Sequence, residues 1–273
     1  SKLYHAEANY NFKQFADVVE VMVGGNFRRY DLFSEGTVFN EDPETGENFE
    51  RIKIDEYGIY TQLSKEVVNN LKLTGSLRYD KNENFDGQVT PRLSAVYTIG
   101  ETHNIRASFQ TGFRNPDTQA QFIYFPAGSG ILLGGTESNA ARYGIHHGGA
   151  VNSEGEVVYL DYITPEKLTA YEIGYKSVIG KNLLLDLNYY YNTYEDFLSA
   201  QTVFSIDPTV HQGNTLPAGT AFRPYTNAKE NVTSQGIGVG ATYNLPANFV
   251  FSGNYNYASF DLDEEPGSEF EPQ

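Results

Sequence analysis

The chain has 273 residues, a formal net charge of −16 and no cysteine. Such an acidic excess disfavours nucleic acid and anionic lipid as electrostatic partners. The lack of cysteine excludes a disulfide framework and thiolate chemistry. No apolar run reaches the roughly 18 residues that a transmembrane helix needs. Membrane-spanning strands stay possible, because they carry a much weaker signal per segment.

Ten segments alternate apolar and polar residues with a period of two, which is typical of β-strands. In chain order they are 3–12, 18–30, 57–67, 71–80, 90–98, 104–112, 167–178, 183–194, 232–243 and 249–260. No long segment has the 3.6-residue apolar stripe of an amphipathic helix. The sequence therefore predicts an all-β protein.

The segment 183–194, LLLDLNYYYNTY, shows the alternation most clearly. As a strand it places Leu183, Leu185, Leu187, Tyr189 and Tyr191 on one face, and Leu184, Asp186, Asn188, Tyr190 and Asn192 on the other. The first face changes from aliphatic to aromatic toward one end. A lipid-facing barrel has this pattern, with aromatic rings at the membrane interface. A soluble sandwich that buries the first face would share it.

The links between the predicted strands alternate between short and long. The short links contain 13–17, 68–70, 99–103, 179–182 and 244–248, and the long links are about 31–56, 81–89, 113–166 and 195–231. This alternation places every long loop at the same end of an up-and-down sheet, as in outer-membrane barrels. Greek-key sandwiches lack it. With charged residues such as Arg78, Arg106 and Glu172 in mid-strand, it favours an antiparallel up-and-down transmembrane β-barrel.

Several segments resemble the barrel of TonB-dependent outer-membrane receptors. They are YGIYTQLSKEVVNNLKLTGSLRYDKNENFDGQVTPR (57–92), HNIRASFQTGFRNPDTQ (103–119), TPEKLTAYEIGYK (164–176), LDLNYYYNTYEDF (185–197) and NVTSQGIGVGATY (231–243). Their order and spacing together carry the resemblance, which covers roughly 57–260. The aromatic, acidic and asparagine-rich composition is similar to that of Bacteroidetes receptors.

The resemblance implies a bacterial outer-membrane barrel of about 22 strands around a plug. It also implies energised uptake of a scarce nutrient: an iron–siderophore, a corrinoid or an oligosaccharide. Ten strands are too few to close such a barrel, so we expect residues 1–273 to be an internal, partial barrel domain without the plug domain.

The expected partners are outer-membrane lipid, a small nutrient ligand at the outer loops and, through parts missing here, the plug domain and the TonB energy-coupling protein. Two alternatives stay open: a soluble or secreted β-sheet module that binds carbohydrate, and a passive porin-like barrel. Detergent dependence would separate the first of these from a membrane barrel.

The long loop 113–166 is the candidate ligand-binding segment, since loops of this length are usually functional or disordered. Its candidate residues are Arg114, Phe122, Tyr124, Phe125, Arg142, Tyr143, His146 and His147. The aromatic rings would stack on a ligand, and the arginines or histidines would hold its anionic groups. In the alternative interpretation the loop packs on its own side chains. For Arg114 we favour a structural ion pair with a carboxylate inside the barrel.

The sequence offers little for catalysis, metals or cofactors. It contains no G-x-S-x-G, H-E-x-x-H or phosphate-binding loop. His146 and His147 are adjacent and would point apart on an extended chain, without cysteine or spaced carboxylates to complete a ligand set. A dinucleotide site requires a helix directly after its glycines, and no helix follows the glycines of GIGVG (236–240). We therefore predict a non-enzymatic chain without metal or cofactor.

Overall fold

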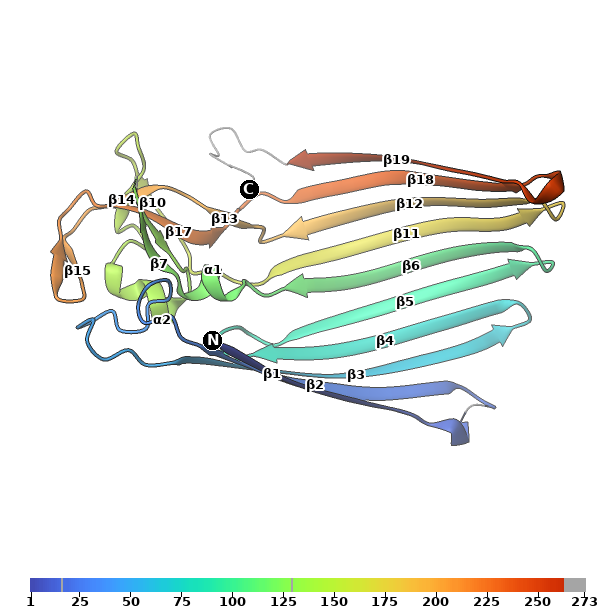
Figure 1. The fold of residues 1–273 in the computed structure, drawn as a ribbon, viewed down its shortest axis with the longest axis horizontal. Helices are drawn as coiled ribbons and strands as arrows, with labels where there is room; N and C mark the ends of the chain where they lie inside the picture. Colours follow the sequence, from blue (N-terminus) through green and yellow to red (C-terminus); the bar gives the residue numbers. More distant parts are fainter. Residues whose placement is uncertain (16, 129, 263–273) are drawn as a thin grey trace.

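The computed structural model describes residues 1–15, 17–128 and 130–262, and its main feature is one antiparallel sheet of ten long strands (Figure 1). The strands are β1 (Lys2–Asn11), β2 (Glu20–Leu32), β3 (Ile52–Val68), β4 (Leu71–Asn82), β5 (Gln88–Ile99), β6 (His103–Arg114), β11 (Glu166–Ile179), β12 (Leu183–Glu195), β18 (Val232–Asn244) and β19 (Val250–Leu262). Each pairs with the next in this order, and β1 and β19 form the two edges of an open sheet. All ten predicted strands are confirmed.

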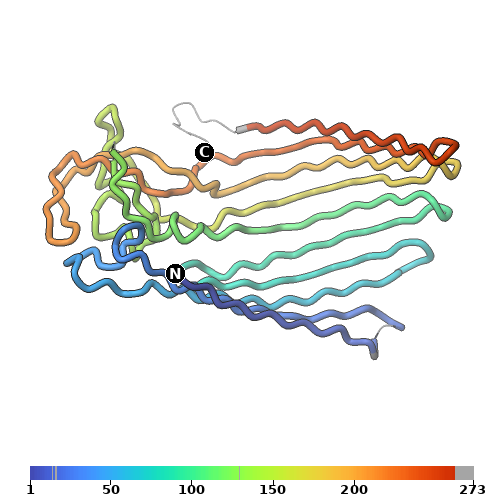
Figure 2. The backbone as a smooth tube through the Cα atoms, viewed as in Figure 1, coloured from blue at the N-terminus to red at the C-terminus, as the bar shows by residue number. Residues whose placement is uncertain are grey.

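The links place a large folded mass at one end of the sheet and tight turns at the other (Figure 2). The segments 33–51, 115–165 and 196–231 all leave from the same end. The predicted long link 81–89 is wrong: β4 continues to Asn82 and β5 begins at Gln88, leaving five residues, 83–87. Lys81 Nζ donates to the carbonyl of the buried Phe85, which holds this short link folded back on β4.

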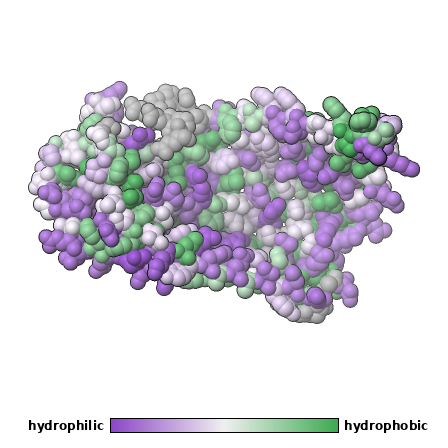
Figure 3. Space-filling model, in the orientation of Figure 1, coloured by the Kyte–Doolittle hydropathy of each residue, from purple (hydrophilic) through white to green (hydrophobic). Residues whose placement is uncertain are grey.

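The two faces of the sheet differ in chemistry, as the alternation predicted. The strand register places Ile105, Tyr175, Leu187, Val239 and Tyr255 in one row across five strands. On this outer face Ile173 is 54% and Ile237 46% exposed. A hydrophobic patch also gathers where β18 turns into β19, where Phe249, Val250 and Phe251 are exposed (Figure 3). The apolar stripes thus have no second layer of protein against them in the described residues.

Residues 115–165 and 196–231 fold together into a unit that we call the outer cap. It contains α1 (Thr118–Phe122), β7 (Tyr124–Ala127), β8 (Gly130–Leu133), α2 (Glu137–Ala140), η2 (Ala141–Tyr143), β9 (Ala150–Val151), β10 (Val157–Val158), β13 (Leu198–Ala200), β14 (Val203–Ser205), β15 (Thr209–His211), β16 (Asn214–Leu216) and β17 (Ala221–Asn227). Two further 3-10 turns, η1 (Lys13–Phe15) and η3 (Pro246–Asn248), lie at the opposite end of the sheet. Among the described residues no helix is long and apolar enough to cross a membrane.

The hydrophobic core lies in the outer cap and not between the long strands. Leu133, Ile145, Val203 and Phe222 are completely buried there. The order of the seven-stranded cap sheet is β10-β9-β14-β17-β8-β7, with β13 also on β17, and β8 and β17 are parallel. The predicted loop 113–166 is therefore half of a packed unit whose other half comes from 196–231.

The two faces of the sheet should respond differently to a new lysine side chain. Replacing Ile173, at the centre of β11 on the outer face, by lysine should destabilise the intact protein in lipid by about 2–4 kcal/mol. Ser108→Lys is the matched control on the inner face, because Ser108 pairs in register with Glu172, which can neutralise the new charge. Urea unfolding in lipid vesicles measures both, and equal losses would contradict the assignment of the faces.

Candidate functional site

A cavity of about 430 Å³ lies between the inner face of β2–β4 and the segment 113–121 that enters the outer cap. Three basic and three acidic side chains line it: Arg28, Arg78, Lys81, Glu56, Asp80 and Asp117. The cavity arises where polar residues of three strands, two apart along each strand, face the same side. It is thus built from both the sheet wall and the cap.

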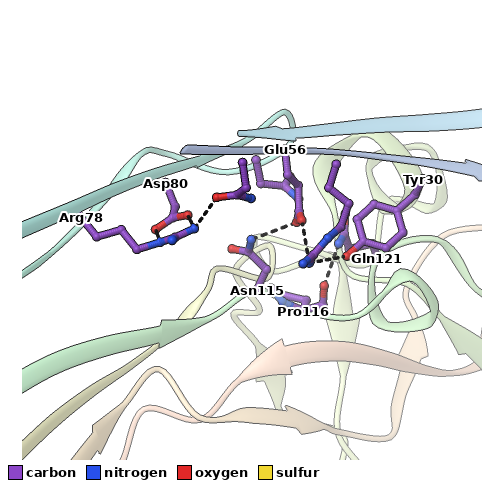
Figure 4. A network of polar contacts seen from close by, with 10 residues as sticks. Tyr30, Glu56, Arg78, Asp80, Asn115, Pro116 and Gln121 are labelled. Carbon is purple, nitrogen blue, oxygen red and sulfur yellow. Dashed lines mark hydrogen bonds and ion pairs between the residues drawn. The ribbon is translucent and has the colours of Figure 1, made fainter. Parts of the chain in front are cut away.

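Arg78 forms the centre of one half of the lining (Figure 4). Its guanidinium binds Asp80 through two hydrogen bonds, Nε to Oδ2 at 2.6 Å and Nη2 to Oδ1 at 2.5 Å. Nη2 also donates to Asn26 Oδ1 at 2.6 Å, and the guanidinium carbon lies 5.4 Å from the centre of the Tyr60 ring. These contacts hold the guanidinium in one orientation through its Nε and Nη2 atoms.

Glu56 forms the centre of the other half. Its carboxylate accepts hydrogen bonds from Asn82 Nδ2 at 2.7 Å and Asn115 Nδ2 at 3.2 Å. Arg28 lies 3.5 Å away and donates to the hydroxyl of Tyr30 at 3.2 Å. Figure 4 shows Asn115 pointing from the cap segment toward Glu56 on the wall. This contact connects the cap to the sheet at the edge of the cavity.

The segment 115–122 is held in place by its own polar groups. Asp117 caps α1 by accepting a hydrogen bond from Ala120 N at 2.7 Å. Gln121 is buried, donates to Pro116 O at 2.7 Å and accepts from Asn84 Nδ2 at 2.8 Å. The cavity therefore presents polar groups that are held in place before a ligand arrives, as is usual for ligand sites.

None of the eight sequence-predicted candidates lines this cavity. Phe122, Tyr124, Tyr143 and His146 are buried in the cap or at its junction with the sheet. Arg114 pairs with Glu166 at 2.5 Å, as its structural interpretation predicted.

The other three candidates, Phe125, Arg142 and His147, lie on the cap surface. His147 Nδ1 is 3.7 Å from Asp161. Ligand contact by these eight residues stays a prediction. Within the described residues no group of three His, Cys, Asp or Glu side chains is arranged to hold a metal ion.

Tyr143 connects three segments that are far apart in the sequence. Asn40 Nδ2 donates to the Tyr143 hydroxyl at 3.1 Å, so that hydroxyl can donate to His211 Nδ1 at 2.9 Å. The His211 ring also stacks on Tyr124 with ring centres 3.5 Å apart. Burial first and the nearby Arg142 second lower the pKa of His211 to about 4, against the opposing effect of Asp42. The contact thus requires neutral His211.

His146 is a second neutral histidine in the cap. It is 7% exposed, packs on Tyr162 with ring centres 4.6 Å apart, and neither ring nitrogen has a hydrogen-bond partner. Burial, and then the adjacent His147, lower the pKa of His146 to about 4, while Asp161 acts in the opposite direction. Its buried, unpaired nitrogens make protonation of the folded cap unfavourable.

A second hollow of about 720 Å³ lies on the cap beside β13 and β17. Its charged lining is mostly acidic: Glu156, Asp161, Asp196 and Glu230, with Lys229 as the basic exception. It lacks the wall contribution that the first cavity has, so the first cavity is the better candidate for a site connected to the interior of the barrel.

Sequence reasoning did not identify Arg28, Tyr30, Glu56 or Gln121 as site residues. Arg28 and Tyr30 lie two residues apart in the predicted strand 18–30 and so share a face, whereas Glu56, which pairs with Arg28 in register, falls outside the predicted strand 57–67. No local signal marks Gln121, whose position depends on how the cap folds.

An open, up-and-down sheet with an apolar outer face and a cap at one end defines the chain as wall and cap of a membrane barrel. The family described as TonB dependent receptor-like, beta-barrel, matches residues 2–271. The chain therefore belongs to this family of bacterial outer-membrane receptor barrels.

Individual relatives agree with this assignment. The chain is 37% identical over 59 residues to the vitamin B12 transporter BtuB of Vibrio vulnificus (strain CMCP6), which covers 22% of this chain and 10% of that protein. The siderophore receptor PirA of Pseudomonas aeruginosa is similar in structure, with a TM-score of 0.62 and 17% identity over 94% of this chain and 40% of PirA. The FrpB iron transporter of Neisseria meningitidis gives a TM-score of 0.63 and 15% identity over 95% of this chain and 35% of FrpB.

The two buried histidines predict that acid loosens the outer cap. Their folded pKa of about 4 lies below the ordinary value of 6.5, so the opened cap binds protons more readily. Cap stability is then complete above pH 6.5 and falls as the pH drops toward 4, by up to about 1.4 kcal/mol per pH unit for His146. Half-buried His211 contributes less.

Amide hydrogen exchange in 130–145 and 203–222 at pH 7 and pH 5, corrected for intrinsic rates, measures this change. His146→Leu should reduce the pH dependence, whereas His5→Leu, on β1 outside the cap, should leave it intact. Protection that is equal at both pH values would contradict the prediction.

Proposed function

We propose that this chain supplies the wall and outer cap of a receptor that captures a nutrient outside the cell for energised uptake. The observation that carries the proposal is the cavity between β2–β4 and the segment 113–121, whose lining comes from wall and cap together. Contact with the cap lets ligand binding influence the cap, and contact with the wall places the ligand at the entrance of the barrel interior. The chain provides binding surface and no chemistry.

The candidate cargoes are an iron–siderophore, a corrinoid and an oligosaccharide. The first two agree with the similar proteins, which are a siderophore receptor, an iron transporter and a vitamin B12 transporter. In this proposal Phe125, Arg142 and His147 make the first contacts on the cap surface. The buried Phe122, Tyr124, Tyr143 and His146 maintain its shape, and Arg114 pairs with Glu166 between β6 and β11 at the base of the cap.

We propose further that a plug domain and the TonB energy-coupling protein drive release into the periplasm. The chain spans only about 35–40% of the length of the solved structures it matches, so these partners act through the whole receptor. A passive porin is disfavoured by the folded cap over the barrel end. A soluble carbohydrate-binding module is disfavoured by outer-face side chains such as Ile173 and Ile237, which are half exposed.

Removing the central ion pair of the cavity tests the proposal. The double substitution Arg78→Ala and Asp80→Ala keeps the net charge and removes the contacts to Asn26 and Tyr60. In the full-length receptor we expect roughly tenfold weaker ligand binding, as for loss of an anchor residue in a binding interface. Energy-dependent uptake of labelled ferric siderophores, cobalamin and neutral oligosaccharides by cells, with and without a protonophore, identifies the cargo and measures the loss.

The matched control removes another inner-face ion pair, Arg106→Ala with Asp186→Ala, whose side chains lie 3.4 Å apart outside the cavity. It should leave binding within about twofold. Two results would contradict the proposal. The cells take up none of the three ligand classes, or the control double substitution weakens binding as much as the double substitution in the cavity.

A further inference from the structure

The hollow of about 720 Å³ on the outer cap, which we call the cap groove, lies on the side of the cap away from the barrel interior. In β13 the side chains of Leu198 and Ser199 point to opposite sides. Leu198 packs against a core cluster that includes Ala120 of α1, whereas Ser199 lines the groove. Lys167, on the outer face of β11, donates to Asp196 Oδ2 in the groove at 2.8 Å. A packed core therefore separates the groove from the candidate cavity.

One side of the cap groove is a strand edge. β10 ends the seven-stranded cap sheet, and β9 pairs with only one of its two edges. The carbonyls of Glu156 and Leu160 accept hydrogen bonds from backbone N–H groups of 147–152, the β9 side, at 2.9 and 3.2 Å. Because peptide groups alternate in direction along a strand, those of Val157 and Tyr159 point away from β9.

The next carbonyl in this series shows that the odd-numbered peptide groups face the groove. Thr226 Oγ1, which lines the groove, donates to the carbonyl of Asp161 at 3.3 Å. Among the described residues, the backbone N–H and C=O of Tyr159 make no hydrogen bond. Val157 is 51% and Tyr159 69% exposed. An unpaired and accessible strand edge of this kind can accept an extended chain as an additional strand.

The charges of the cap groove select a basic partner. Four carboxylates and one lysine line it: Glu156, Asp161, Asp196, Glu230 and Lys229. Of these four carboxylates, only Asp196 forms an ion pair with a lysine or arginine of the described residues. The exposed ring of Tyr159 offers a π face to a lysine or arginine side chain. The edge thus favours an extended peptide, and the charges favour a cationic one.

We propose that the cap groove is a docking site for an extended cationic peptide segment of another molecule. The segment pairs with the backbone of Val157 and Tyr159 as an added strand, and its basic side chains lie near Asp161 and Glu230. This interaction goes beyond the proposed uptake function and does not depend on it, because the groove and the candidate cavity lie on opposite sides of a packed core.

Isothermal titration of the purified full-length receptor with the capped hexapeptides KVKVKV and EVEVEV tests the charge preference. We expect KVKVKV to bind and EVEVEV not to bind. Two N-methylated forms of KVKVKV, one methylated at its lysine amides and the other at its valine amides, test strand pairing. Only alternate amides of an added strand face the edge, so one form should bind roughly tenfold more weakly or worse, and the other should bind almost as well as KVKVKV.

Substitutions in the groove test its residues. The double substitution Asp161→Asn and Glu230→Gln keeps side-chain size and should weaken KVKVKV binding roughly fivefold, as for loss of two exposed ion pairs. Glu154→Gln is the matched control, because Glu154 is an exposed carboxylate of the same loop that does not line the groove. It should leave the affinity nearly unchanged.

Three results would overturn the docking site. KVKVKV does not bind the full-length receptor, as would also happen if another loop of the receptor filled the groove. The two N-methylated forms bind equally well, so that pairing with a strand edge plays no part. The double substitution and the Glu154 control have the same effect, which would place the peptide elsewhere. Uptake of labelled nutrients is measured separately, so failure of the docking site leaves the proposed function intact.

Discussion

The structure depends on one constraint: a chain inside a bilayer must pair every backbone N–H and C=O with another part of the protein. The ten strands meet it by pairing with their neighbours in chain order. Because side chains alternate, each strand must then place apolar groups toward lipid and polar groups inward. Charged residues such as Arg106 and Asp186 are tolerated in mid-strand because they meet each other on the inner face.

The same constraint explains why the hydrophobic core lies in the outer cap. The apolar side chains of the long strands face outward, so they cannot pack against one another across the barrel. The cap has no lipid around it and must bury its own apolar groups, as Leu133, Val203 and Phe222 do. Its strands are two to seven residues long, and β8 pairs with β17, in which Phe222 lies opposite Ile131. Such short, distant elements leave no periodic pattern in the sequence.

The long strands could be predicted from the sequence, but the outer end of β3 could not. The prediction began at Tyr57, whereas β3 begins at Ile52. Beyond the apolar band the alternation reverses: Ile54 is buried with Leu32 and Phe122 under the cap, while Asp55 pairs with Arg29 on the opposite face. The alternation used for the prediction comes from contact with lipid, and it ends at the edge of the apolar band. The first residues of β3 lie beyond that edge, so their sequence resembled a loop.

Loop composition was a poor guide to the site for a related reason. Aromatic and histidine side chains serve equally to bind ligands and to fill a core, and only their partners distinguish the two. The hydroxyl of Tyr143 is occupied by Asn40 and His211, so this ring holds the cap together.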